Sequence, residues 1–168
     1  MVSDVDTAWL AGIVDGEGCF SVKRPIRRKS GKRVGSVTSY QLWMVICNTS
    51  KPMVDRVAQV FAALGVHHQP VRRVWKGKRA TRWQYWIHVA RKRDMLRLTR
   101  ALLPYLTAKK AEAEVVDWYL SRSCRVPVYK THSDEAAVLD SMSVIKRNGG
   151  ESTPATRRLL AKTKARGE

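Results

Sequence analysis

Two carboxylates, Asp15 and Glu17, stand at the end of an N-terminal segment that is rich in small residues. Before them, Ala8, Gly12 and Gly16 recur every four residues, which places all three on one side of a helix. Such a smooth stripe lets two helix backbones approach each other closely. Carboxylate oxygens are also ligands of Mg²⁺, which usually takes one or two of them together with phosphate and water. One acidic side chain at the end of a helix suits a site of that kind.

The helix that carries these acids is predicted over 7–15, with Asp4 or Asp6 as its N-cap. The elements after it are expected, in chain order, as strands over 19–28 and 37–47, a helix up to Gly65 capped by Asn48, Thr49 or Ser50, strands over 71–76 and 81–89, and helices over 93–103, 107–122 and 133–146. Because no spacing indicates a parallel crossover, we expect an α+β fold with antiparallel hairpins. Residues 1–150 are expected to form one domain, and residues 151–168 a weakly structured basic tail.

The charge of the chain points to an anionic partner. Its 168 residues include 32 Lys and Arg against 14 Asp and Glu, a formal net charge of +18, and nucleic acid is the usual partner of such a protein. An apolar fraction of 44% argues against a disordered basic tail. The three cysteines are far apart, which makes a disulfide framework or structural zinc unexpected. No apolar run is long enough for a membrane helix, and no secretory signal is evident, so we expect an intracellular protein, cytoplasmic or organellar.

The segment Leu10-Ala11-Gly12-Ile13-Val14-Asp15-Gly16-Glu17-Gly18 resembles the signature of the LAGLIDADG homing endonucleases. Five of the nine positions are identical, and the other four carry chemically close replacements. The predicted order of elements also matches the αββαββα repeat of that family, over about residues 5–122. The resemblance implies an αββαββα homing-endonuclease fold in which four antiparallel strands form a DNA-binding saddle, followed here by extra C-terminal helices.

The resemblance also implies roles for the acidic helix end. Glu17 aligns with the metal-binding acid of the family, and Gly16 could add its backbone carbonyl to the same Mg²⁺ or Mn²⁺ ion. For Asp15, a structural part near the helix end and a ligand role are equally open. The chain has one copy of the motif, and family members of that kind form homodimers through this helix. Ala8, Gly12 and Gly16 would then line the dimer interface, and the DNA site would be approximately palindromic.

Other catalytic positions are carried over one at a time. A polar residue closes the second strand in the family, and a basic residue follows shortly after it; these positions fall on Cys47-Asn48 and on Lys51. Cys47 stands where a glutamine is often found, so that either Asn48 takes over the water-positioning role or the role is absent. Lys109 matches a lysine near the active centre, with Lys110 next in order, and such a lysine would stabilise charge on the phosphate.

The saddle should present polar and basic side chains to the major groove, where base edges are readable. Ser21, Lys23 and Arg27 share one face of the first strand, and Arg82 and Gln84 share one face of the fourth. On the third strand Arg72 and Arg73 compete for that face, and on the second Tyr40, Leu42 and Met44 compete with Gln41, Trp43 and Val45. The basic turns at 27–33 and 76–79 are expected to touch phosphates.

These features together predict a sequence-specific, Mg²⁺-dependent double-strand DNA endonuclease. By the resemblance, it would cut across the minor groove of a pseudo-palindromic site and leave short 3′ overhangs. The alternative is a catalytically inactive relative that acts as an RNA maturase or a DNA-binding regulator. A basic ribosomal or RNA-binding protein would explain the charge, but it would leave the glycine stripe that ends in Glu17 unexplained.

Overall fold

The computed structural model describes residues 2–23, 41–74, 83–123 and 132–164. In chain order these residues form helix α1 (Asp4–Glu17), strands β1 (Gly18–Lys23) and β2 (Gln41–Asn48), helix α2 (Lys51–Ala63), strands β3 (Arg72–Val74) and β4 (Gln84–Val89), and helices α3 (Lys92–Leu102), α4 (Lys110–Ser123), α5 (His132–Arg147) and α6 (Pro154–Lys164). The α+β class and the αββαββα order with additional C-terminal helices are confirmed. None of the described helices is long and apolar enough to cross a membrane.

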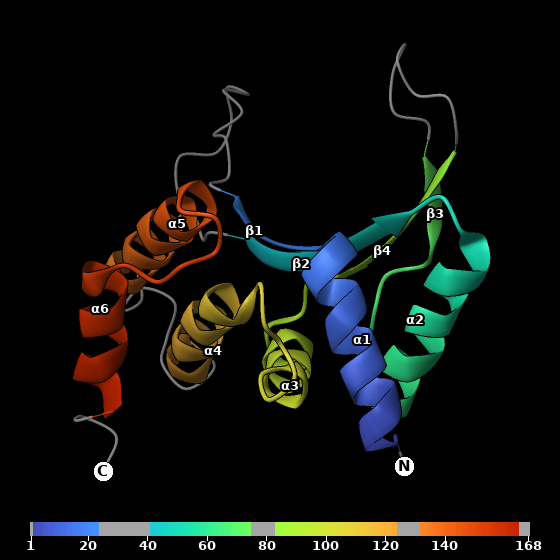
Figure 1. Cartoon of the computed structure of the whole chain (residues 1–168), viewed down its shortest axis with the longest axis horizontal. Coiled ribbons are helices and arrows are strands. Elements are labelled where there is room, and N and C mark those ends of the chain that lie inside the picture. The colour runs from blue at the N-terminus through green and yellow to red at the C-terminus, as the bar shows by residue number, and fades with distance from the viewer. Residues whose placement is uncertain (1, 24–40, 75–82, 124–131, 165–168) are drawn as a thin grey trace, which may run out of the picture.

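The strands form one antiparallel sheet in the order β1-β2-β4-β3. Helices α1, α2 and α3 pack against one face of it (Figure 1). Every second strand residue points into this face, and five such side chains are fully buried: Phe20, Met44, Ile46, Ile87 and Val89. Each buried side chain of this size contributes about 1.5–3 kcal/mol to folding. The opposite side of the sheet, which these helices do not cover, is called the open face below.

The first helix begins earlier than predicted, and its cap is Ser3 rather than Asp4 or Asp6. The Ser3 side chain accepts a hydrogen bond from the Asp6 amide at 3.1 Å, and its hydroxyl donates to the Asp6 carboxylate at 2.8 Å. This reciprocal pair satisfies a donor that the first helical turn would otherwise leave free. Among the three caps considered for α2, the structure selects Ser50, which accepts from the amide of Met53.

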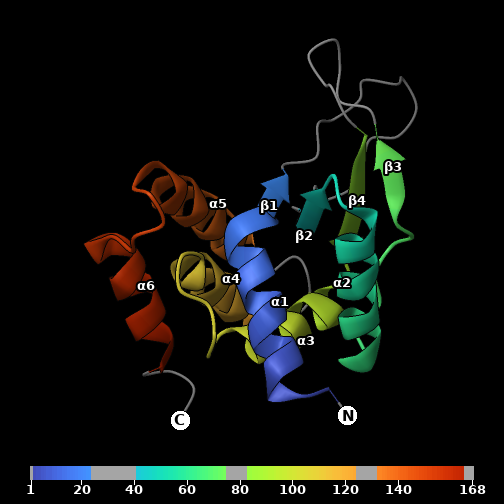
Figure 2. The ribbon, with the colours of Figure 1, turned by 45° about the vertical axis from the view of Figure 1, so that its right-hand side comes forward.

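The C-terminal region differs from its prediction. Residues 154–164, expected as part of a weakly structured tail, instead form α6. This helix packs on α4, and its residue Thr156 is buried. Thr153 accepts a hydrogen bond from the Thr156 amide at 3.2 Å and so begins this helix. Helices α5 and α6 lie at the β1 end of the sheet, whereas α2 lies at the β3 end (Figure 2).

Candidate active site

Glu17 is the last residue of α1, and its side chain is exposed. Gly18 begins β1 directly, with φ −78° and ψ 156°, so that no loop separates the helix from the strand. A Cβ atom at position 18 would lie 2.7 Å from the Val14 carbonyl oxygen, which is closer than real Cβ contacts allow. Glycine at this position therefore permits the sharp junction, and the junction presents the Glu17 carboxylate at the edge of the sheet.

Asp15 ties the end of α1 to the start of α4. One carboxylate oxygen accepts the Thr107 amide and the other accepts the Lys109 amide, both at 2.8 Å. These amides precede the first residue of α4, where backbone donors have no partner within the helix. Of the two roles that were open for Asp15, the hydrogen bonds favour the structural one.

Replacing Asp15 with alanine is expected to cost about 1–2 kcal/mol of unfolding free energy, as loss of a helix cap does. Urea denaturation of the purified protein measures the change. Asp55→Ala is the matched control, because its i,i+4 salt bridge to Lys51 is exposed and such pairs contribute about 0.5 kcal/mol. If both variants lost the same small amount of unfolding free energy, the hydrogen bonds of Asp15 to the segment before α4 would contribute no more to stability than an exposed salt bridge does.

Lys109 is the lysine that the fold brings to the end of α1. Its side-chain ammonium donates a hydrogen bond to the Asp15 carbonyl oxygen, two residues before Glu17. A positive charge is favourable there, because the carbonyls at a helix C-terminus carry partial negative charge. Lys109 is half-buried, whereas Lys110 is exposed on the first turn of α4. The structure therefore joins Glu17, Asp15 and Lys109 in one site and leaves Lys110 at its margin.

Asn48 and Lys51 instead build the start of α2. The Asn48 side-chain oxygen accepts the Ser50 amide at 2.8 Å, and the Lys51 ammonium pairs with Asp55 at 2.6 Å. Among the described residues, no hydrogen bond or ion pair joins either side chain to Glu17. Cys47 lies on the open face, where it pairs with Trp86 of β4. The last pair of the β1–β2 ladder is Gly18–Ile46, and Glu17 and Cys47 are the next residues beyond it on the two chain segments. Cys47 is thus the β2 residue nearest to Glu17 in register.

The strand pairing decides which residues share the open face. Arg72 pairs with Trp86 and Val74 with Gln84, so these residues lie on the open face, as do Trp43, Val45, Cys19 and Ser21. Lys23 and Gln41 pair with each other at the end of the β1–β2 ladder. Arg73 pairs with Tyr85 on the helix-covered side, where its guanidinium lies 4.2 Å from the Trp83 ring centroid. The predicted contacts Arg27 and Arg82 lie outside the described residues.

His88 adds an imidazole to the open face, where it pairs with Val45. Burial, followed by the positive charge of Arg72, lowers the pKa of His88 below its usual value. The imidazole is therefore neutral near pH 7, and it can both donate and accept a hydrogen bond.

Two residues beside the site were missed by the sequence prediction. Glu112 on α4 is buried, and Lys146 on α5 donates a hydrogen bond to the Phe20 carbonyl oxygen at 2.6 Å. Glu112 precedes Val115, Val116 and Tyr119 by three, four and seven residues, so it falls on the predicted apolar stripe of α4. A charged residue on such a stripe was an available signal that this carboxylate is buried beside a positively charged side chain.

No family model matches the chain, and no curated protein matches it in sequence. Among solved structures, the homing endonuclease I-CvuI in complex with the I-CreI target superposes with a TM-score of 0.62 and 20% identity, over 95% of both chains. I-CvuI in complex with its own target gives 0.60 and 20%, over 96% of both chains. The LAGLIDADG homing endonuclease I-SmaMI bound to cleaved DNA gives 0.52 and 11%, over 84% of this chain and 43% of that one. The chain therefore has the fold of the LAGLIDADG homing endonucleases.

Proposed function

We propose that this chain is a sequence-specific DNA endonuclease that acts as a homodimer with Mg²⁺ or Mn²⁺. The observation that carries the proposal is the exposed Glu17 carboxylate at the junction of α1 and β1, at a helix end where the Asp15 carbonyl oxygen also binds the Lys109 ammonium. The structures with this fold described above include a complex with cleaved DNA, which supports a nuclease rather than a binder alone. Because its substrate is DNA, we expect the protein to work inside the cell.

Exposed small residues on α1 support the homodimer. A Cβ atom at Gly12 or Gly16 would meet no described atom within 4 Å, so contacts within the chain do not explain these glycines. Glycine in a helix interior costs about 1 kcal/mol relative to alanine. In Figure 1, α1 lies at the front of the molecule, and Ala8 as well as the larger Val5 and Trp9 are exposed on it. A second copy of α1 packed on this stripe would explain both the glycines and the exposed apolar side chains.

The donor atoms at the helix end fit a hard divalent cation. One protomer offers the Glu17 carboxylate and the Gly16 carbonyl, and both are oxygen ligands of the kind that Mg²⁺ prefers. The described part of the chain holds no cluster of three or more acidic, histidine or cysteine side chains, so the remaining ligands would come from the second protomer, DNA and water. When bound, the metal would lower the pKa of a water molecule and stabilise the leaving oxygen.

Lys109 would act on the phosphate rather than on the metal. Its ammonium is held by the Asp15 carbonyl and its backbone by the Asp15 carboxylate, so the charge is fixed before DNA arrives. A fixed positive charge beside a phosphate stabilises negative charge that develops during cleavage, and it needs no reorganisation to do so. Asn48 and Lys51 remain candidates for ordering water at the other side of the site.

The open face would lie along the major groove. It combines Arg72, Gln84 and Ser21, whose side chains can read base edges. Lys23 stays a predicted DNA contact at the end of β1. The basic turns beyond the described strands would touch phosphates. A homodimer would join two such faces and read a pseudo-palindromic site. It would cut each strand across the minor groove and leave short 3′ overhangs.

Arg72 and Arg73 provide a matched pair for testing this interface. We expect Arg72→Ala to weaken binding to the preferred site by about 1–3 kcal/mol and to relax the sequence preference at one position per half-site. Arg73→Ala should leave the sequence preference unchanged, because its side chain stacks on Trp83 on the opposite side. Binding-site selection from randomised DNA, followed by affinity titration, separates the two. If only Arg73→Ala relaxed the DNA sequence preference, the bases would be read by the helix-covered side of β3, and the proposed role of the open face would be wrong.

The proposed activity is tested by incubating the protein with a randomised DNA library and Mg²⁺ and sequencing the ends. Cleavage at one symmetric sequence with short 3′ overhangs supports the proposal. Binding without cleavage in Mg²⁺ and in Mn²⁺ would favour the DNA-binding regulator, and preferential binding of structured RNA would favour the maturase.

A further inference from the structure

Lys146 reaches from α5 to the main chain that follows Glu17. Its ammonium donates to the Phe20 carbonyl at 2.6 Å and lies 3.4 Å from the Cys19 sulfur. Phe20 is three residues after Glu17, whereas the Asp15 carbonyl held by Lys109 is two residues before it. Two lysines, one just before α4 and one on α5, therefore bind carbonyl oxygens on both sides of Glu17.

A buried carboxylate lies between these two lysines. The side chain of Glu112 is 7% exposed, and its Oε2 atom has no hydrogen-bond partner and lies 4.0 Å from the Lys146 ammonium. Burial raises the pKa of Glu112, and the positive charges of Lys146 and Lys109 act against this rise. Glu112 thus feels both lysines, and its buried negative charge needs them, since an unpaired buried charge is costly.

The turn between α5 and α6 contacts the same region. Gly150 has φ +98°, and a Cβ atom there would lie 2.7 Å from the Ala108 carbonyl oxygen. Ala108 lies between the two residues whose amides bind Asp15. The C-terminal helices therefore touch both the strand after Glu17 and the segment that carries Lys109.

We propose that Lys109, Glu112 and Lys146 form a clasp that positions Glu17, with Glu112 and Lys146 as positioning residues that do not touch DNA or metal. The inference rests on the proposed function, because it concerns the same site. Fixing the carbonyls on both sides restricts the backbone of Gly16 and Glu17, so that the proposed metal ligands keep one geometry. The C-terminal helices, which follow the αββαββα unit, are then required for cleavage as well as for packing.

Lys146→Met tests the clasp, because it removes the ammonium and keeps most of the aliphatic side chain. We expect the single-turnover cleavage rate to fall by about ten- to a hundredfold, as when catalytic groups are misplaced by about 1 Å. DNA affinity in Ca²⁺ should change by less than about threefold, because Lys146 is not a phosphate contact in this proposal. Hydrogen–deuterium exchange at the Thr107 and Lys109 amides should become faster in the DNA-free protein.

Arg100→Met is the matched control. Arg100 pairs with Asp117 at 2.8 Å and so ties α3 to α4, and none of its hydrogen bonds among the described residues involves a residue of the clasp. The control should keep the wild-type cleavage rate and the slow exchange of the two amides. Equal losses in both variants, or wild-type cleavage and exchange in Lys146→Met, would overturn the clasp.

A second pair of variants approaches the clasp from the α5–α6 turn. Both Gly149 and Gly150 have positive φ, but only a Cβ at Gly150 would strike another segment. Gly150→Ala should therefore slow cleavage and speed exchange of the Lys109 amide, whereas Gly149→Ala should do neither. If the wild-type protein cut no DNA, the proposed function would be wrong. Faster exchange of the Lys109 amide in Gly150→Ala would still show that the α5–α6 turn holds the segment before α4, and unchanged exchange would overturn the clasp.

Discussion

Replacing Glu17 with glutamine is expected to abolish cleavage and to leave the fold and DNA binding intact. Changes to residues that merely support metal ligands cost about 10- to 100-fold, so loss of the ligand charge should cost more than about a hundredfold. Glutamine keeps the length of the side chain, and the Glu17 side chain is exposed, so the melting temperature should not change. Single-turnover cleavage in Mg²⁺ and affinity in Ca²⁺ measure the two effects separately.

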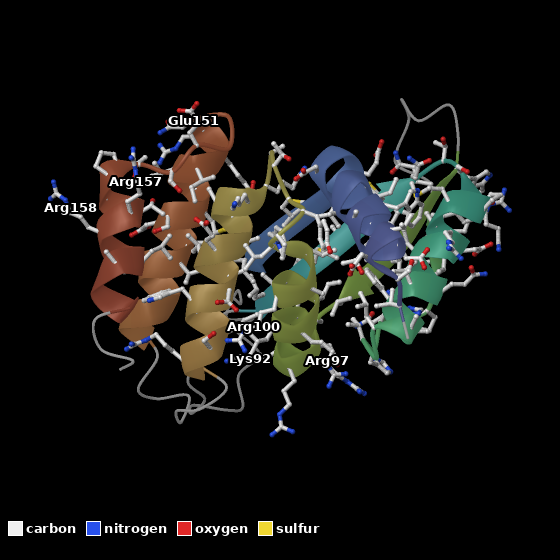
Figure 3. All side chains as sticks on the ribbon, turned by 60° about the horizontal axis from the view of Figure 1, so that its bottom comes forward. Lys92, Arg97, Arg100, Glu151, Arg157 and Arg158 are labelled. Atoms are coloured by element: carbon white, nitrogen blue, oxygen red, sulfur yellow. The ribbon has the colours of Figure 1, made fainter. Side chains whose placement is uncertain are left out.

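Glu151→Gln is the control for the charge change in this experiment. Glu151 is exposed in the turn before α6, and removing its charge alters the net charge by the same amount (Figure 3). This variant should cut DNA at the wild-type rate. Wild-type cleavage by Glu17→Gln would show that the metal is held elsewhere.

Gly12→Leu is expected to convert the proposed dimer into monomers without unfolding them. Because a Cβ atom at Gly12 would meet no atom of the described residues within 4 Å, α1 should gain about 1 kcal/mol of helix stability. At a two-fold interface the same leucine would occur twice between closely packed helices. Overpacking costs about 1–3 kcal/mol per site, so the dimer dissociation constant should rise at least about thirtyfold.

Sedimentation velocity over a range of protein concentrations measures this change, and thermal unfolding confirms that the monomer stays folded. Ala62→Leu, on the exposed side of α2, is the control and should not change the dissociation constant. If the wild-type protein were monomeric at every concentration, or if Gly12→Leu left the dissociation constant unchanged, the proposed dimer through α1 would be wrong.

Local patterns were sufficient to predict most of the fold. Phe20, Ile87 and Val89 alternate with polar residues, and each proved to be buried on the predicted side. In β2 and β3 the same reasoning could not choose a face, because both sets of residues contain large or charged side chains. The choice depends on pairing with β4, which is a contact between distant segments.

The two clear errors also have physical causes. Ser3, Asp4 and Asp6 can all cap a helix, and the choice depends on the backbone conformation of Ser3. The helix over residues 154–164 depends on packing against α4, because its basic sequence has few apolar residues of its own. Tertiary contacts often stabilise short helices that would be marginal alone.

At the candidate site, the sequence predicted Glu17 and Lys109 as site residues, but not the hydrogen bonds by which Lys109 is held at Asp15. The Asp15 contacts with Thr107 and Lys109 join residues more than 90 positions apart. No spacing rule detects such a link. Lys146 is a further 37 residues along the chain from Lys109, on a helix whose position against β1 only the tertiary structure reveals.

The junction at Gly18 has a mechanical consequence for the proposed dimer. Since α1 passes into β1 without a linker, the helix that would meet its partner and an edge strand of the proposed DNA-binding face cannot move independently of each other. Any change in the angle between two α1 helices must tilt both β1 strands against the groove. A DNA site that fits the β1 strands poorly would thus change the geometry at the two-fold axis, where the two Glu17 carboxylates would lie close together. The rigid junction alone would then lower the cleavage rate at wrong sites, without a separate conformational step.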